Sequence, residues 1–233
     1  MKRLEKNYQK VPRKSSKAVK DLLKIDLHVH TVYSYDSSIT PKELVFYAKK
    51  HGLDGVAVTD HDRLDGALKI MKETDFLIVP GMEITSLKGH IIGLNVQEPV
   101  PPKLSVEETV DRIHKAGGIA VACHPGTPFK GSLRKNVTSD FDAVEVINSS
   151  AVPFRYSVKY AEKIASRLGK PRVAGSDAHY GPEIGYAYTV VNADSDRDEI
   201  VKAIEKGRCS PFGGAIPVRI RLKREILSLK RRF

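Results

Sequence analysis

The sequence predicts an α/β protein built as a distorted, incomplete (β/α) barrel. From residue 24 onward, short apolar runs alternate with segments that have the periodicity of amphipathic helices, a pattern typical of parallel strands joined by crossover helices. The length of 233 residues suits one such unit, because barrels routinely reach about 200–250 residues as a single domain. The hydrophobic share of 41% and the charged share of 29% exclude a chain that is mostly disordered.

Eight short runs are expected to be strands, because each is apolar and bounded by turn or helix signals. They are residues 24–30, 55–59, 76–80, 90–96, 119–123, 143–147, 172–175 and 187–191. The stretch from 76 to 96 leaves no room for a helix between its two strands. The alternation of strand and helix is therefore expected to be interrupted there.

Capping residues indicate where the helices begin and end. Thr40 with Glu43 forms a capping box that has proline at the first helical position, and Ser105 with Glu108 forms a second. Asp194 or the residue after it is expected to cap a later helix that ends near residue 207. Glycines expected to end helices in the left-handed conformation are Gly52, Gly117 and Gly169.

The two ends of the chain are basic, whereas its body is nearly neutral. Of the net charge of +11, residues 1–24 contribute +7 and residues 219–233 contribute +6, which leaves −2 for the residues between them. We expect a basic N-terminal extension at 1–23, one domain at 24–212 and a basic C-terminal tail at 213–233. Such ends either attract nucleic acid or anionic lipid, or are solvated tails without a specific partner.

The composition places the protein in a reducing cytoplasm. No apolar run approaches the ~18–20 residues that a membrane-spanning helix needs, and the N-terminus has no apolar segment of signal-peptide length. Two cysteines, Cys123 and Cys209, are too few for a disulfide framework or a cysteine zinc site. Nothing in the sequence specifies the oligomeric state.

Histidines and acids gather where the expected strands end. Six of the eight histidines lie at or beside strand ends, namely His28, His30, His61, His90, His124 and His179. Three acids lie in corresponding places, namely Asp36, Glu83 and Asp177. The carboxyl ends of barrel strands meet at one rim, where barrel enzymes hold their active sites. Imidazole and carboxylate groups without thiolate suit zinc, manganese or iron, so these nine residues predict a metal centre.

A single histidine at a strand end more often satisfies ordinary hydrogen bonds than binds a metal. Six at successive strand ends are difficult to explain by coincidence, although His90 is the weakest member because it precedes its strand. His51 and His114 lie near expected helix C-termini, where a partial positive charge suits the helix dipole. We expect both of these to be structural.

In order along the chain, the sequence contains the motifs Asp26-Leu27-His28-Val29-His30-Thr31, Tyr33-Ser34 with Asp36, Thr59-Asp60-His61-Asp62, Pro80-Gly81-Met82-Glu83, His124-Pro125 and Gly175-Ser176-Asp177-Ala178-His179. They resemble the ordered motifs of the polymerase and histidinol phosphatase (PHP) domain family. The resemblance covers residues 24–191, and the expected domain includes a continuation at 184–212. The histidine-x-histidine pair also occurs in amidohydrolases and metallo-β-lactamases, but the further motif of the latter is absent.

The resemblance implies a TIM-barrel-like (β/α)7 fold that holds two to three divalent ions, zinc, manganese or iron, at the C-terminal rim of its strands. The first ion would be bound by His28, His30, Glu83 and Asp177. Glu83 would bridge to a second ion at His124, with His90 alongside. The third would be bound by Asp36, His61 and His179. Some relatives have histidine at the position of Asp36.

Such a cluster predicts phosphate-ester hydrolysis that needs no protein nucleophile. Ions about 3.5–4 Å apart would share a bridging hydroxide and clamp the oxygens of the ester. Glu83 would hold two ions together, and Asp177 or His61 would relay protons. Cations that could bind the rest of the substrate, or could equally be surface charges, are Arg155, Arg134 and Lys130.

Three further residues near the rim have two readings each. Glu145 ends a strand there and could orient a ligand histidine. Tyr33 and Tyr180 could stack on a base, although packing in the core is the more common role of such residues.

The leading hypothesis is a cytoplasmic hydrolase acting on small nucleotides or other phosphorylated metabolites. One alternative is a 3′–5′ exonuclease acting on nucleic-acid ends through the basic termini, and a histidinol-phosphate phosphatase is another. A third alternative, of a different class, is a non-catalytic scaffold or binding module. That hypothesis predicts missing metal ligands, and none of the nine is missing.

Overall fold

One sheet of nine strands forms the framework of the protein, in a computed structural model that describes residues 22–128 and 131–230. The strands are β1 (Leu22–Val29), β2 (Gly55–Val58), β3 (Leu77–Ser86), β4 (Gly89–Leu94), β5 (Ile119–Ala122), β6 (Ala143–Asn148), β7 (Arg172–Gly175), β8 (Ala187–Asn192) and β9 (Cys209–Gly213). The helices are α1 (Pro41–Lys50), α2 (Asp65–Glu73), α3 (Val106–Lys115), α4 (Phe154–Leu168), α5 (Arg197–Glu205) and α6 (Val218–Lys230), with short 3₁₀ turns at η1 (Arg134–Asn136) and η2 (Gly181–Glu183).

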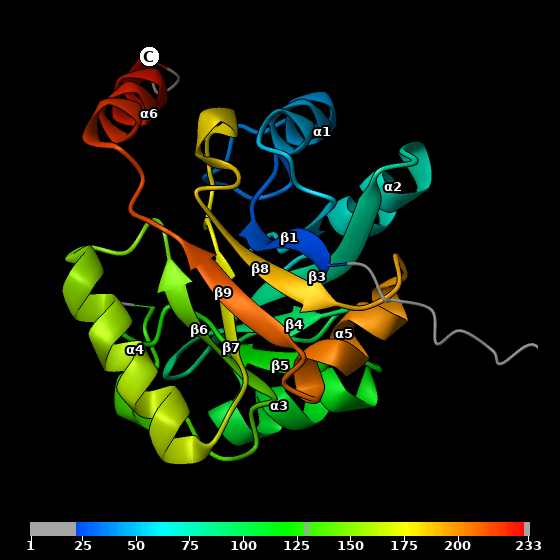
Figure 1. Cartoon of the computed structure of the whole chain (residues 1–233), viewed down its shortest axis with the longest axis vertical. Coiled ribbons are helices and arrows are strands. Elements are labelled where there is room, and N and C mark those ends of the chain that lie inside the picture. The colour runs from blue at the N-terminus through cyan, green and yellow to red at the C-terminus, as the bar shows by residue number, and fades with distance from the viewer. Residues whose placement is uncertain (1–21, 129–130, 231–233) are drawn as a thin grey trace, which may run out of the picture.

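The sheet curls into a nearly closed barrel with helices around it (Figure 1). β1, β2 and β3 are parallel neighbours, as are β5, β6 and β7. β8 pairs antiparallel with β1, and β9 pairs antiparallel with β8. Val29 pairs with Ala178 just beyond β7, and the Asp177 N–H donates to the His28 carbonyl at 2.8 Å. These contacts bring the first and seventh strands together and confirm the predicted barrel.

The interruption predicted between residues 76 and 96 is a β-hairpin. β4 runs antiparallel to both β3 and β5, so it begins at the rim where the parallel strands end. β3 continues to Ser86 because it pairs with β4 along the whole hairpin, from Gly81 opposite Leu94 onward. Glu83 therefore lies within β3 and not after its end, which corrects the expected strand at 76–80.

Most of the predicted helix caps are present. The Thr40 hydroxyl accepts from the Glu43 N–H at 3.3 Å and the Glu43 carboxylate accepts from the Thr40 N–H at 2.9 Å. Of the second box, the Ser105 half is present, since its hydroxyl accepts from the Glu108 N–H at 3.1 Å, while the Glu108 carboxylate lies 3.7 Å from Arg112. The cap of α5 is Asp196, two residues beyond Asp194. The three helix-ending glycines have positive φ angles of 67°, 79° and 63°.

Two elements near the C-terminus were not expected. β9 has the sequence Cys-Ser-Pro-Phe-Gly, which lacks an alternating apolar pattern, and its proline is tolerated because β9 is an edge strand. Residues 218–230, expected to belong to a basic tail, form α6. Figure 1 shows α6 at the end of the barrel toward which the arrow of β6 points. Of the expected N-terminal extension, residues 22–23 belong to β1 and the remainder lies outside the described residues.

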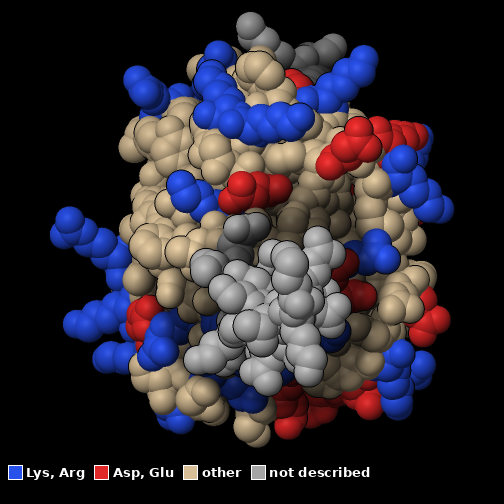
Figure 2. Space-filling view, turned by 45° about the vertical axis from the view of Figure 1, so that its right-hand side comes forward, with Lys and Arg blue, Asp and Glu red and all other residues tan. Residues whose placement is uncertain are grey.

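Charged side chains of both signs are interspersed on the face that Figure 2 shows. This distribution agrees with the nearly neutral body calculated from the sequence. Among the described residues, no helix has the length and apolar character that crossing a membrane requires.

Two apolar clusters hold the sheet in place. One contains Ile25 of β1, Val79 of β3 and Ile92 of β4, packed against Ile200 and Ile204 of α5. The other includes buried residues of α1, α2, α3 and α4. Together they leave the rim at the carboxyl ends of the strands to polar side chains.

Candidate metal centre

The structure brings all nine predicted ligand residues together at the barrel rim. They come from six strands (β1 to β5 and β7), or the segments directly after them, and from the loop that follows β1. The residues form overlapping groups of possible ligands, and one of these groups consists of His28, His30, Glu83 and Asp177. Side chains separated by up to about 150 positions in the sequence thus share one small volume.

The donor atoms of this first group lie nearly as far apart as ligands around one ion do. The His28 Nε2 atom lies 3.1 Å from His30 Nε2, 3.2 Å from Glu83 Oε2 and 3.5 Å from Asp177 Oδ1. The His30 Nε2 atom lies 3.1 Å and 3.4 Å from the same two oxygens. Ligand atoms about 2.0–2.2 Å from a tetrahedral zinc lie about 3.3–3.6 Å from one another. Four separate donors therefore converge on one point.

Glu83 connects this group to a second. Its Oε2 atom belongs to the first group, whereas its Oε1 atom lies 2.9 Å from His124 Nε2 and 2.8 Å from His90 Nδ1. His90 reaches the rim because β4 is antiparallel and begins there. The Cys123 thiol also lies 3.5 Å from Oε1, and burial raises its pKa well above the usual value, which makes it a neutral neighbour.

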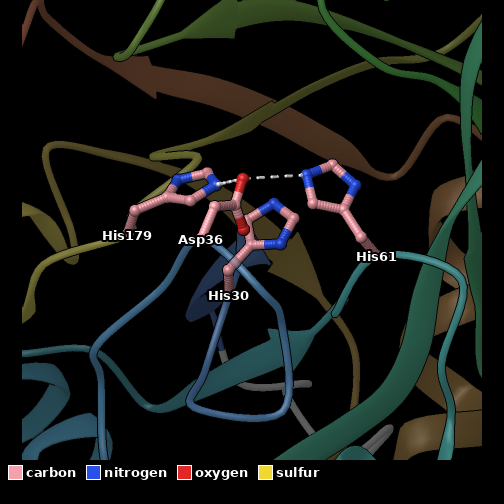
Figure 3. A group of neighbouring side chains, drawn as sticks. All are labelled: His30, Asp36, His61 and His179. Atoms are coloured by element: carbon pink, nitrogen blue, oxygen red, sulfur yellow. Dashed lines mark ion pairs between the residues drawn. The ribbon is translucent and has the colours of Figure 1, made fainter. Parts of the chain in front are cut away.

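A third group lies at the open side of the cluster (Figure 3). Asp36 Oδ2 is 3.2 Å from His179 Nε2 and 3.4 Å from His61 Nε2. His30 lies between these two histidines, with its ring centroid 4.2 Å from that of His179 and 4.5 Å from that of His61. Asp36 is 32% exposed, whereas the histidines of the first group are fully buried. The third group is thus the most accessible of the three.

The electrostatics of the cluster favour cations. Burial alone would raise the pKa of Glu83, but the positive charge of His28 and hydrogen bonds from His124 and His28 hold that pKa well below its usual range. Asp177 shows the same balance and a lowered pKa. Burial would lower the pKa of His30, yet hydrogen bonds to Asp177 and Glu83 raise it to about 9. The site retains ionised carboxylates and takes up positive charge, a requirement that divalent ions would satisfy.

Residues outside the nine orient the ligands. Glu145 Oε1 lies 3.1 Å from His28 Nδ1, while Oε2 accepts from the His124 N–H at 2.7 Å and from Asn148 Nδ2 at 3.0 Å. A carboxylate on the far nitrogen of an imidazole fixes its tautomer and increases its basicity as a ligand. The sequence suggested this position for Glu145, and the structure places its carboxylate there.

Two buried acids of the motifs have structural contacts that the sequence did not reveal. Asp26 accepts from the Ser176 N–H at 2.8 Å and from the Gly185 N–H at 2.9 Å. Asp60 accepts from the backbone N–H of Thr31 at 2.6 Å. Both carboxylates join loops of the rim to one another, which holds the ligand-bearing segments in register.

A cavity of about 360 Å³ opens from the cluster. Its lining includes Asp177 and His179, and it also includes Arg221 and Arg224 of α6. These arginines were not predicted, because they lie in a segment whose only signal was its positive charge. Nothing in the sequence indicated that this segment returns to the rim.

The arginines suggested by the sequence do not line this cavity. Arg134 donates to the Thr127 carbonyl at 3.0 Å and lies over the Tyr160 ring, 4.6 Å from its centroid. Arg155 is exposed in the first turn of α4, and Lys130 lies outside the described residues.

The tyrosines and the two remaining histidines occupy other surroundings. Tyr33 packs against the core, whereas Tyr180 lines a second cavity near α6. His51 hydrogen-bonds to the Ile184 carbonyl, and His114 bonds to Asp142 at 2.8 Å. Neither belongs to the candidate ligand groups found among the described residues, which agrees with the structural role expected for them.

Comparisons with known proteins agree with this geometry. A model of the PHP domain matches residues 26–124, and a model described as PHP-associated matches residues 157–209. The chain is 39% identical over 141 residues to an uncharacterised protein of Methanocaldococcus jannaschii, covering 54% of this chain and 82% of that protein. It is 27% identical over 215 residues to a probable phosphatase of Syntrophotalea carbinolica, covering 72% and 87%.

A solved structure shows the same fold. It is a two-domain protein of Bacteroides vulgatus described as containing a predicted PHP-like metal-dependent phosphoesterase. The two structures superpose with a TM-score of 0.68 at 19% identity, and the match covers 97% of this chain and 75% of that one.

Proposed function

Because the chain belongs to the PHP family, we propose that it is a metal-dependent phosphoesterase whose two to three divalent ions are held by the nine-residue cluster. The observation that carries the proposal is the position of Glu83, whose two carboxylate oxygens face two different ligand groups. A buried carboxylate shared in this way suits a site with more than one ion. The relative described as a probable phosphatase supports the same class of reaction.

The side chains have distinct roles in this proposal. Bound ions would supply charge that stabilises a phosphoryl group and lowers the pKa of water. His28 and His30 hold the buried end of the site, with Glu145 fixing the His28 ring. Asp177 lines the cavity, is 17% exposed and accepts from Asn148 Nδ2 at 3.2 Å through its Oδ2 atom, and it is one candidate for proton transfer. His61, 8% exposed, is the other candidate for proton transfer.

The substrate we propose is a small phosphate ester, such as a nucleotide or another phosphorylated metabolite. The cavity of about 360 Å³ lies at the lower end of the range of about 300–1,000 Å³ for small-molecule sites. A 3′–5′ exonuclease would need a basic track for the polymer. The residues between the two basic ends of the chain carry a net charge of only −2, which favours the small substrate.

The test is a panel of phosphate esters offered to protein reconstituted with zinc, manganese or iron. We expect hydrolysis of mononucleotides or sugar phosphates, loss of turnover on chelation, and two to three ions per chain by elemental analysis. A content below about one ion per chain after reconstitution contradicts the multinuclear site. Folded, metal-loaded protein that hydrolyses no ester supports the scaffold hypothesis instead.

A further inference from the structure

The inner face of α6 contributes two arginines to a site otherwise built from the barrel. Arg221 and Arg224 line the cavity together with Asp177, His179 and Ser150. The helix begins at Val218, beyond the last residue of the PHP-associated match at position 209. Neither family model therefore includes these two guanidinium groups.

Arg221 is fixed by the backbone around it. Its Nε–H donates to the Ile216 carbonyl at 3.1 Å, Nη1 to the Ser150 carbonyl at 3.0 Å and Nη2 to the Ser149 carbonyl at 2.6 Å. A guanidinium has five N–H groups, so these bonds leave two N–H groups for another acceptor. The carbonyls belong to the loop after β6 and to the residues before α6, and they hold the side chain at the cavity wall.

Arg221 and Arg224 differ in their partners. Arg224 pairs with the fully buried Glu183 at 3.3 Å and with Glu225 at 3.2 Å. Within residues 22–128 and 131–230, none of the ion pairs includes Arg221, whose partners are carbonyl oxygens. A half-buried cation held next to a second cation favours the binding of an anion.

Resting on the phosphoesterase function proposed above, we propose that Arg221, with Arg224 beside it, binds a second anionic group of the substrate. The phosphoryl group that is hydrolysed faces the metal cluster, where bound ions compensate its charge. The remaining wall of the same cavity offers the guanidinium of Arg221. The substrate class is therefore a small phosphomonoester that also carries a carboxylate or a second phosphate.

Direct binding tests the anion site without turnover. Inorganic phosphate is titrated calorimetrically into the metal-free full chain, so that no bound ion contributes to the binding. Arg221→Gln keeps an N–H donor for the carbonyls but removes the charge, and we expect at least ~10-fold weaker phosphate binding. Lys223→Gln, on the exposed side of the same helix, is the matched control and should bind phosphate as the wild type does.

Kinetics on a matched pair of substrates test selectivity. 3-Phosphoglycerate and glycerol 3-phosphate differ by a carboxylate in place of a hydroxymethyl group. In metal-reconstituted wild type we expect a higher kcat/KM for the first, and Arg221→Gln should reduce the ratio of the two values at least ~10-fold. Circular dichroism checks that the variant folds. Arg221→Met is a second variant that lacks the positive charge.

The outcomes separate this proposal from the function on which it rests. Phosphate affinity in Arg221→Gln and Arg221→Met equal to that of the wild type, or an unchanged substrate ratio, overturns the anion site while the phosphoesterase function stands. Arg221-dependent phosphate binding in a protein that hydrolyses no ester overturns the function and leaves the anion site.

Discussion

Glu83 is the residue on which the arrangement of the cluster depends. Its side chain is 1% exposed and its two oxygens contact donors of two ligand groups. Glu83→Gln keeps the shape but removes the negative charge that holds two cations close together. We expect the loss of one metal equivalent and a fall in kcat of at least ~100-fold, comparable with the removal of a key electrostatic group.

The measurement combines elemental analysis with steady-state kinetics on the reconstituted protein. Glu108→Gln provides the control, because that carboxylate is exposed on α3 and pairs with Arg112. Near-normal activity with full metal content in Glu83→Gln would show that Glu83 has only a structural role.

The sequence predicted the individual ligands because each follows a strand end, and strand ends meet in a barrel. It could not predict which nitrogen or oxygen faces which neighbour. The division of Glu83 between two groups arises from the β3–β4 hairpin, which keeps Glu83 inside a strand opposite Ile92. The position of Arg221 at the cavity could not be predicted, because the carbonyls that hold it, those of Ser149 and Ser150, lie about 70 positions earlier in the sequence.

At the level of elements, β1 and β7 approach closely enough to require glycine at position 175. A Cβ atom built on Gly175 would lie 2.4 Å from His28 Cβ and 2.9 Å from the Glu145 carboxylate. The end of β7 therefore determines where the first ligand histidine lies. The same approach closes the barrel and brings Asp177 to the His28 carbonyl.

Gly175→Ala should displace His28 from the first group. We expect weaker retention of metal, at least ~10-fold lower activity, and a loss of about 1–3 kcal/mol in stability from overpacking. Metal content after dialysis and thermal unfolding measure both effects. Gly214→Ala is the control, since nothing lies within 4 Å of a Cβ there and its φ is not positive. Equal metal retention in the two variants would refute the steric requirement at position 175.

Elements differ in how clearly the sequence marks them. α1 has both partners of its capping box, and these residues predicted where the helix begins. β9 is short, lies at an edge and contains proline, so no periodic pattern identifies it. α6 has apolar residues on both its inner and its exposed sides, with Val218 70% and Leu222 58% exposed, and therefore lacks the one-sided apolar pattern of a helix packed on a core.

At the scale of the whole molecule, charge distinguishes a small substrate from a polymer. Residues 1–24 carry +7 and residues 219–233 carry +6, against −2 for the rest. The basic residues of 219–233 do not all lie in the same surroundings. Arg221 and Arg224 line the cavity, whereas Arg219 and Lys223 are exposed. Affinity for a nucleic acid would have to come mainly from the ends, whereas a small ester needs only the cavity.

Deleting residues 1–20 and 231–233 removes much of this charge and spares β1 and α6. If the substrate is a small ester, kcat/KM on it should change less than ~2-fold, because the cavity residues all remain. A nucleic-acid substrate predicts instead that binding weakens strongly on deletion and that the intact chain shows a steep salt dependence. The expected slope is about 0.7 logarithmic units per counterion released from a single strand. Titrations of a short oligonucleotide at several salt concentrations, with intact and trimmed protein, decide between them. Faster cleavage of oligonucleotides than of mononucleotides at low salt, abolished by the trimming, would establish the exonuclease and refute the small-substrate proposal.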